Sequence, residues 1–133
     1  MHTITSLRAK EILQSCNGST IAVVGDIMLD KYFWGSVTRI SPEAPVPVID
    51  LEHESLHLGG AANVAGNLKA LGIKPLLCGI AGTDNSGHSL LEILKENGSS
   101  TNGIVCLDSR PTTVKTRIIG NNQQMVRLDR EVR

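Results

Sequence analysis

The chain has 133 residues, of which 41% are hydrophobic and 20% are charged, and its formal net charge at pH 7 is zero. This balance indicates one globular domain and excludes an intrinsically disordered chain, which would carry fewer apolar residues and more net charge. No apolar run is long enough to span a bilayer, and no signal-like pattern begins the sequence, so a cytoplasmic location is expected. The three cysteines form no C-x-x-C pair, which predicts free thiols in a reducing compartment.

The first two elements predicted along the chain are a helix and a strand. Ser6 is expected to cap a helix over residues 7–14. The β-branched run 20–24 predicts a central parallel strand. Asp26 and Asp30 follow that strand closely. Because ligands of open α/β sheets collect beyond the carboxyl ends of the strands, both aspartates are expected at the ligand-binding edge.

Residues 32–57 and 112–130 predict two extended segments. Prolines exclude an ordinary helix from the first, and a turn signal at Gly120-Asn121-Asn122 predicts a hairpin in the second. The first segment is acidic and the second basic, so opposite charges are expected to pair across one small antiparallel sheet outside the main domain. Three adjacent aromatic residues begin the first segment: Tyr32, Phe33 and Trp34. They are expected to be hydrophobic anchors in either a monomer core or a dimer interface.

A helix-to-strand unit lies between these segments. The pair Gly59-Gly60 frees the backbone for positive φ and close approach, and a helix of small residues with Asn63 in its first turn follows. Gly72 is expected to end that helix, and residues 76–81 predict a buried strand. Asp84 is expected to begin the next helix. The unpaired N–H groups of the first helix suit a hydroxyl group or an anion.

The same residues carry a resemblance to a known family. The run GGAANVA at residues 59–65, followed by Gly72 and Gly82, resembles the first signature of the PfkB-type, ribokinase-like sugar kinases. Residues 34–48 are similar to the kinase domain of D-glycero-β-D-manno-heptose 7-phosphate kinases, enzymes of lipopolysaccharide inner-core precursor synthesis. The resemblance extends over about residues 21–130 and implies a Rossmann-like, mainly parallel sheet with helices on both faces. It also implies a small β-sheet lid, which in many members mediates dimerisation.

The resemblance further implies a reaction and its cofactors. The family moves the γ-phosphoryl group of ATP to a sugar, here the anomeric hydroxyl of heptose 7-phosphate, with Mg²⁺. Its glycine-rich G-A-G-D loop, which holds the catalytic aspartate, and its magnesium-associated N-x-x-E motif are not in this sequence. Residues 1–133 are therefore expected to be the N-terminal portion of a longer kinase domain, with no catalytic base, ATP site or metal site. Alone, the chain is expected to be inactive as a kinase.

By the same resemblance, Asp30, Gly59, Gly60 and Asn63 are expected to bind the sugar. Asn63 offers both a donor and an acceptor to a hydroxyl group. A carboxylate that accepts hydrogen bonds from hydroxyl groups contributes about 1.5–3 kcal/mol for each bond, so one well-placed aspartate matters to sugar affinity. The alternatives are a turn or helix-cap role for Asp30 and a plain tight turn for the two glycines.

A basic group in the second extended segment is expected to recognise the phosphate of the substrate: Lys115, Arg117 and Arg127. Arg117 is favoured because the planar guanidinium matches phosphate geometry, and Lys115 is its expected companion. The alternative for each is a solvated strand face. Zero net charge and the lack of interleaved aromatic residues argue against nucleic acid as the partner. The histidines show no metal-binding spacing and are expected at the surface or in the core.

Two other functions remain open on the sequence alone. One is a non-catalytic module that binds a sugar phosphate or forms a homodimer through its small sheet. The other is a dinucleotide-binding oxidoreductase domain, suggested by the strand that ends in Gly25-Asp26 but weakened by the missing G-x-G-x-x-G turn.

Overall fold

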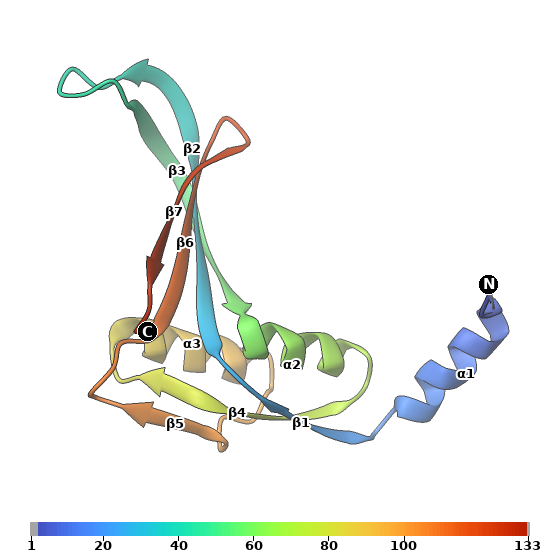
Figure 1. The fold of residues 1–133 in the computed structure, drawn as a ribbon. Helices are drawn as coiled ribbons and strands as arrows, with labels where there is room; N and C mark the ends of the chain where they lie inside the picture. The colour runs from blue at the N-terminus through green and yellow to red at the C-terminus, as the bar shows by residue number, and fades with distance from the viewer. Residues whose placement is uncertain (1–2, 133) are drawn as a thin grey trace.

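A computed structural model describes residues 3–132, which fold into three helices and seven strands arranged in two sheets (Figure 1). In chain order the elements are α1 (Ser6–Cys16), β1 (Thr20–Val24), β2 (Ile27–Ile40), β3 (Pro47–Gly59), α2 (Gly60–Ala70), β4 (Lys74–Gly82), α3 (Asn85–Glu96), β5 (Ile104–Leu107), β6 (Thr113–Gly120) and β7 (Gln123–Arg130). The α/β class and the presence of a second sheet agree with the sequence-based expectation, but within residues 3–132 the second sheet has four strands and the core sheet has three.

The core sheet has the strand order β1-β4-β5, and both of its pairings are parallel. Helices α2 and α3 lie on one face of this sheet (Figure 1). Ala62 and Ala65 of α2 are fully buried, and their short side chains let the helix approach the strands closely. The buried core between these layers and the base of β2 contains Ile27, Leu29, Ala62, Ala65, Leu77, Ala81, Leu90, Leu94 and Val114.

The opposite face of the core sheet is open within residues 3–132. Its apolar side chains Leu76, Ile80 and Val105 are 41–56% exposed. Helix α1 extends away from the sheet (Figure 1), and none of its residues is buried. The expectation of helices on both faces is therefore not met by the described part of the chain.

The second sheet, called here the outer sheet, has the order β3-β2-β6-β7 and rises from the core as a tall, twisted ribbon (Figure 1). β2 pairs antiparallel with β3, and β6 pairs antiparallel with β7. β2 and β6 pair in parallel, so the expected all-antiparallel sheet was wrong. The physical reason is that both strands leave the carboxyl edge of the core sheet, β2 after β1 and β6 after β5. They therefore run in the same direction.

The charges also pair differently from the expectation. Ion pairs form mostly within each hairpin: Lys31 with Glu54 at 3.2 Å, and Lys115 with Asp129 at 3.1 Å. The acidic residues of 32–57 thus do not pair with the basic residues of 112–130 in the described structure. One ion pair does join the two hairpins, and it uses Asp30, which precedes the acidic segment.

The turns and caps follow the sequence closely. Gly72 has φ +78° just past α2, and Asn121 and Asn122 have φ values of 50° and 65° in the β6–β7 turn. The cap of α1 is Thr5 rather than Ser6, because the Thr5 hydroxyl accepts the hydrogen bond from the Arg8 N–H. Cys16, Cys78 and Cys106 are free thiols. None of the helices in residues 3–132 is long and apolar enough to cross a membrane.

Candidate functional site

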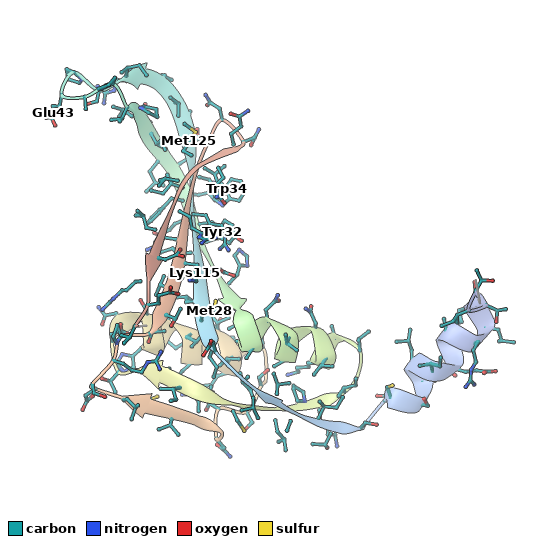
Figure 2. All side chains as sticks on the ribbon, in the orientation of Figure 1. Met28, Tyr32, Trp34, Glu43, Lys115 and Met125 are labelled. Carbon is teal, nitrogen blue, oxygen red and sulfur yellow. The ribbon has the colours of Figure 1, made fainter. Side chains whose placement is uncertain are left out.

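The candidate site lies where the outer sheet meets the start of α2. Asp30 of β2 is in register with His57 of β3 on one side and Lys115 of β6 on the other. Residues in register share a face of the sheet, so all three side chains point to the same side. Figure 2 shows this strip of the outer sheet, with Met28 at its base and Tyr32 and Trp34 higher on the same strand.

The glycine pair packs directly under Asp30. A Cβ atom on Gly59 would lie 2.8 Å from Asp30 Oδ2, closer than real Cβ contacts allow. Gly60 has φ +54°, and a Cβ atom there would overlap the Asp26 carbonyl oxygen. Gly59 is thus required for the close approach of a carboxylate, and Gly60 is required both for its positive φ and for the close approach of the Asp26 carbonyl.

Arg117 binds the other oxygen of the same carboxylate. Its Nη1 lies 2.6 Å from Asp30 Oδ1, and the two side chains are 24% and 20% exposed. The hydrogen bond to Asp30 raises the pKa of Arg117 above its ordinary value. The guanidinium also lies over the Tyr32 ring, 5.2 Å from its centroid. Asp30 therefore has one oxygen held by Arg117 and the other beside Gly59.

Lys115 belongs to a neighbouring charge cluster. Its ammonium group lies 3.1 Å from an Asp129 oxygen and 2.5 Å from Glu131 Oε2, and the hydrogen bonds that it donates to Glu131 and, to a smaller extent, to Asp129 raise its pKa. Asp129 also accepts two hydrogen bonds from Arg127, at 2.8 and 3.0 Å, which together with Lys115 lower its pKa despite the opposing effect of desolvation. The structure therefore pairs each of the predicted phosphate-binding cations with a carboxylate.

The three aromatic residues do not act as one group. Tyr32 and Trp34 share the face of Asp30: their rings stack at 6.0 Å, Trp34 stacks on His53 at 5.7 Å, and Tyr32 meets His57 edge-on at 5.4 Å. Phe33 points to the opposite face because side chains alternate along a strand. The three residues, for which a shared role in a lid or a dimer interface was predicted, therefore lie on two different faces of the outer sheet. Tyr32 and Trp34 border the candidate site, and Phe33 belongs to another surface.

That other surface of the outer sheet carries the Lys31–Glu54 ion pair, and next to Phe33 it is apolar. It contains a groove of about 590 Å³, lined by Phe33, Val46, Pro47, Ile49, Leu51, Ile118, Met125 and Val126. Several of these side chains are well exposed, Leu51 at 57% and Val126 at 44%. The outer sheet therefore has a polar face that carries Asp30 and an apolar face that carries Phe33.

Asn63 lies near this site but is not joined to Asp30 by a hydrogen bond in the described structure. It is exposed in the first turns of α2 and lines a groove of about 520 Å³ between β3, α2 and α3, together with His57 and Lys69. His57 is in register with Asp30 and also lines the groove that Asn63 lines. Alternation along β3 indicates which of its side chains share a face with His57, but the register of His57 with Asp30 depends on the strand pairing.

Asp26 and Asp84 stabilise local structure, Asp26 at the glycine turn and Asp84 at the start of α3. The Asp26 carbonyl accepts a hydrogen bond from the Ala61 N–H at 2.8 Å, which fixes the glycine turn. Asp84 caps α3 by accepting from the Gly87 N–H at 3.0 Å and from the buried Thr112 hydroxyl at 2.7 Å. Burial acts to raise the pKa of Asp84, but these hydrogen bonds outweigh it and lower the pKa.

The described residues form neither a Mg²⁺ site nor an ATP phosphate site. No group of three or more His, Cys, Asp or Glu side chains in residues 3–132 is placed to hold a metal ion. The space beside the glycine pair is filled by Met28, Asp26 and Asp30, so this turn does not form an open phosphate cradle. Neither group therefore fits the residues described here.

Curated relatives match most of the chain. Residues of this chain are 53% identical to "Bifunctional protein HldE" of Magnetococcus marinus over 111 residues and of Wolinella succinogenes over 120 residues. The protein of the same name from Helicobacter pylori strain J99 is 50% identical over 113 residues. These alignments cover 84%, 90% and 85% of this chain but 23%, 25% and 24% of the relatives, so the chain spans about a quarter of their length.

Solved structures match the fold. A carbohydrate kinase from Agrobacterium tumefaciens superposes with a TM-score of 0.67 at 22% identity, covering 84% of this chain and 35% of that structure. Arabidopsis thaliana ribokinase, solved with ribose and ATP, superposes with a TM-score of 0.66 at 19% identity, covering 85% and 36%. These likenesses confirm the ribokinase-like α/β fold, of which the chain spans about a third.

The family model agrees with both comparisons. The model described as "pfkB family carbohydrate kinase" matches residues 19–131, which include both sheets, the glycine pair and Asp30. This is most of the chain, and it confirms the resemblance that the GGAANVA run indicated. The chain belongs to the pfkB family of carbohydrate kinases.

Proposed function

We propose that this chain is the sugar-phosphate-binding, N-terminal part of an ATP-dependent carbohydrate kinase. The proposed substrate is D-glycero-D-manno-heptose 7-phosphate, phosphorylated at its anomeric hydroxyl to the 1,7-bisphosphate for lipopolysaccharide core precursor synthesis in the cytoplasm. Membership of the family and 50–53% identity to proteins named HldE support the kinase assignment. The resemblance of residues 34–48 to heptose 7-phosphate kinases supports the choice of sugar.

The observation that carries the proposal is the environment of Asp30. Its carboxylate lies at the junction of the two sheets, beside a glycine that leaves room on one side and beside Arg117 on the other. A carboxylate with a nearby cation suits a ligand that has hydroxyl groups and a phosphate. Sugar hydroxyls would donate to Asp30, and Arg117 and Lys115 are the proposed phosphate-binding side chains.

ATP is the proposed phosphoryl donor. Arabidopsis ribokinase and Xylella fastidiosa fructokinase, both similar in fold, are described as structures with ATP. When bound, ATP supplies the γ-phosphoryl group. The residues described here bind and orient the acceptor sugar, and the base, the ATP site and the Mg²⁺ site are proposed to lie in further sequence of a longer protein.

The outer sheet is proposed to act as a lid. Its polar face carries the candidate sugar-binding residues, so movement of this sheet toward a bound sugar would exclude water from the reacting hydroxyl. Its apolar face is the proposed homodimer interface. The exposed groove at Phe33 and Ile118 suits an apolar surface of the same kind on a second copy.

Isothermal titration of Asp30→Asn with heptose 7-phosphate tests this function. The substitution keeps the shape of the side chain but removes its charge, so the affinity is expected to fall by about tenfold or more. Asp50→Asn is the matched control, because Asp50 also lies on the outer sheet but its carboxylate accepts a hydrogen bond from the exposed Thr38 hydroxyl. Equal affinity of Asp30→Asn and the unmodified chain would contradict the proposal.

A non-catalytic module is the second candidate, and the apolar groove favours it. A chain that self-associates but shows no saturable sugar-phosphate binding would be a dimerisation module. Binding without ATP turnover in the longer protein would indicate a sugar-phosphate-binding protein.

A further inference from the structure

Asp30 and Arg117 form an ion pair with each other, and the proposed function assigns each of them a different group of the substrate. Asp30 is proposed to accept from the sugar hydroxyls, and Arg117 is proposed to bind the phosphate. In the structure each is the partner of the other, at 2.6 Å and with most of both side chains buried. Neither group can meet its ligand fully until this contact loosens.

Breaking such a contact has different consequences for two kinds of ligand. A sugar without a phosphate could satisfy Asp30, but it would leave the guanidinium partly buried without an anion. An unpaired buried charge is costly, so this exchange is unfavourable. A sugar phosphate replaces both partners at once, because its hydroxyl groups donate hydrogen bonds to the carboxylate and its phosphate accepts hydrogen bonds from the guanidinium.

We infer that the Asp30–Arg117 pair is a specificity device that makes the substrate's phosphate necessary for tight binding. This inference rests on the proposed function and adds a mechanism of discrimination to it. Arg117 is then a specificity-determining residue with two opposite effects. It strengthens the binding of phosphorylated sugars directly, and it weakens the binding of unphosphorylated sugars by occupying Asp30.

The surroundings of Arg117 support a contact that can be exchanged for a ligand, not one that is purely structural. Its guanidinium lies over the Tyr32 ring, which supports the planar group without using any of its N–H donors. The only side-chain hydrogen bond found for Arg117 in the described residues is the one to Asp30 through Nη1. The remaining donors of its planar fork are thus not committed to protein side chains there.

The test compares two ligands on Arg117→Gln. Isothermal titration is carried out with heptose 7-phosphate and with unphosphorylated heptose, on the unmodified chain and on the variant. The affinity for the phosphorylated sugar is expected to fall by about tenfold or more, as for the loss of a charge-assisted contact. The affinity for the unphosphorylated sugar is expected to stay the same or increase, because Asp30 is released.

Lys31→Gln is the matched control. Lys31 is adjacent to Asp30 on β2 but points to the opposite face, where it pairs with Glu54. It is expected to change neither affinity. Arg117→Lys keeps the charge but loses the fork, and it should retain part of the preference for the phosphorylated sugar.

Each outcome has a distinct meaning. Equal losses for both sugars in Arg117→Gln, with circular dichroism unchanged, would overturn the inference, since Arg117 would then only hold Asp30 in place. No loss for either sugar would overturn it as well. If the unmodified chain binds neither sugar, the proposed function itself fails. If it binds both sugars equally well, the function stands and the inference falls.

Discussion

Gly59 and Asp30 are in a contact that no other residue at position 59 would allow, because a Cβ atom there would lie 2.8 Å from Asp30 Oδ2. The same Cβ atom would lie 2.8 Å from Met28 Cγ. The glycine of the family signature is therefore explained by the carboxylate above it. φ at this position does not require glycine, since it is −116°.

Gly59→Ala is expected to displace Asp30 and Met28 and to destabilise the chain by about 1–3 kcal/mol, as for other overpacked sites. Sugar-phosphate affinity should fall with it, because Asp30 can no longer sit beside the turn. Urea unfolding and isothermal titration measure the two effects.

Gly66→Ala is the matched control in the same region. Gly66 lies inside α2, and a Cβ atom there would meet nothing within 4 Å. Alanine should stabilise the helix by about 0.5–1 kcal/mol and leave sugar-phosphate affinity unchanged. A stabilised Gly59→Ala variant with normal affinity would contradict the explanation given for the glycine.

Thr112→Val should destabilise the junction between the core sheet and the outer sheet. Thr112 is 1% exposed, and its hydroxyl accepts from the Gly82 N–H at 2.9 Å and donates to Asp84 Oδ1. Valine leaves the Gly82 N–H without this partner, so the free energy of unfolding should fall by about 1–3 kcal/mol. Thr112→Ser keeps the hydroxyl and should cost less. Equal losses in urea unfolding would show that the hydroxyl is unimportant.

The stability of the chain should depend on Asp84 at acidic pH. Its pKa in the folded chain is lowered below the ordinary 3.8, so the unfolded chain binds its proton first as the pH falls. The stabilisation from Asp84 is therefore fully present at pH values above 3.8 and is lost as the pH falls through the lowered pKa.

Asp84→Asn keeps a good helix cap and removes the titration. The difference in the free energy of unfolding between the unmodified chain and this variant should be largest near neutral pH. It should shrink as the pH falls below about 4, the ordinary range of an aspartate. Urea unfolding at several pH values measures it, and a difference that is constant with pH would exclude Asp84 as the source.

The proposed dimer predicts a concentration-dependent mass. Ile118→Asp places a charge in the apolar groove of the outer sheet, where burial against a second copy would be unfavourable. Sedimentation equilibrium should show a dimer for the unmodified chain and a monomer for this variant. Ser55→Asp, on the polar face in register with Tyr32, should remain dimeric. A monomer at all concentrations for the unmodified chain would remove the basis for the interface.

The local features of this chain could be predicted from its sequence. Gly72 and the Asn121-Asn122 turn need positive φ, and Asp84 is a good helix cap, so short-range sterics and hydrogen bonding determine these positions. Strand β1 has the residues that its β-branched run indicated. The GGAANVA run also sufficed to identify the family. Its glycines and small side chains are required because a few nearby residues pack closely against them.

Only the tertiary structure decided which distant residues meet. Asp30 and Arg117 are 87 positions apart, and they pair because β2 and β6 run in parallel from the same edge of the core sheet. Charge patterns along the sequence carry no information on strand direction or register. The antiparallel pairing and the ion pairs that were predicted from these patterns therefore do not form between β2 and β6. The tertiary structure also decided which face of β2 borders the candidate site, so that Tyr32 lies beside Arg117 while its neighbour Phe33 lines the groove on the opposite face.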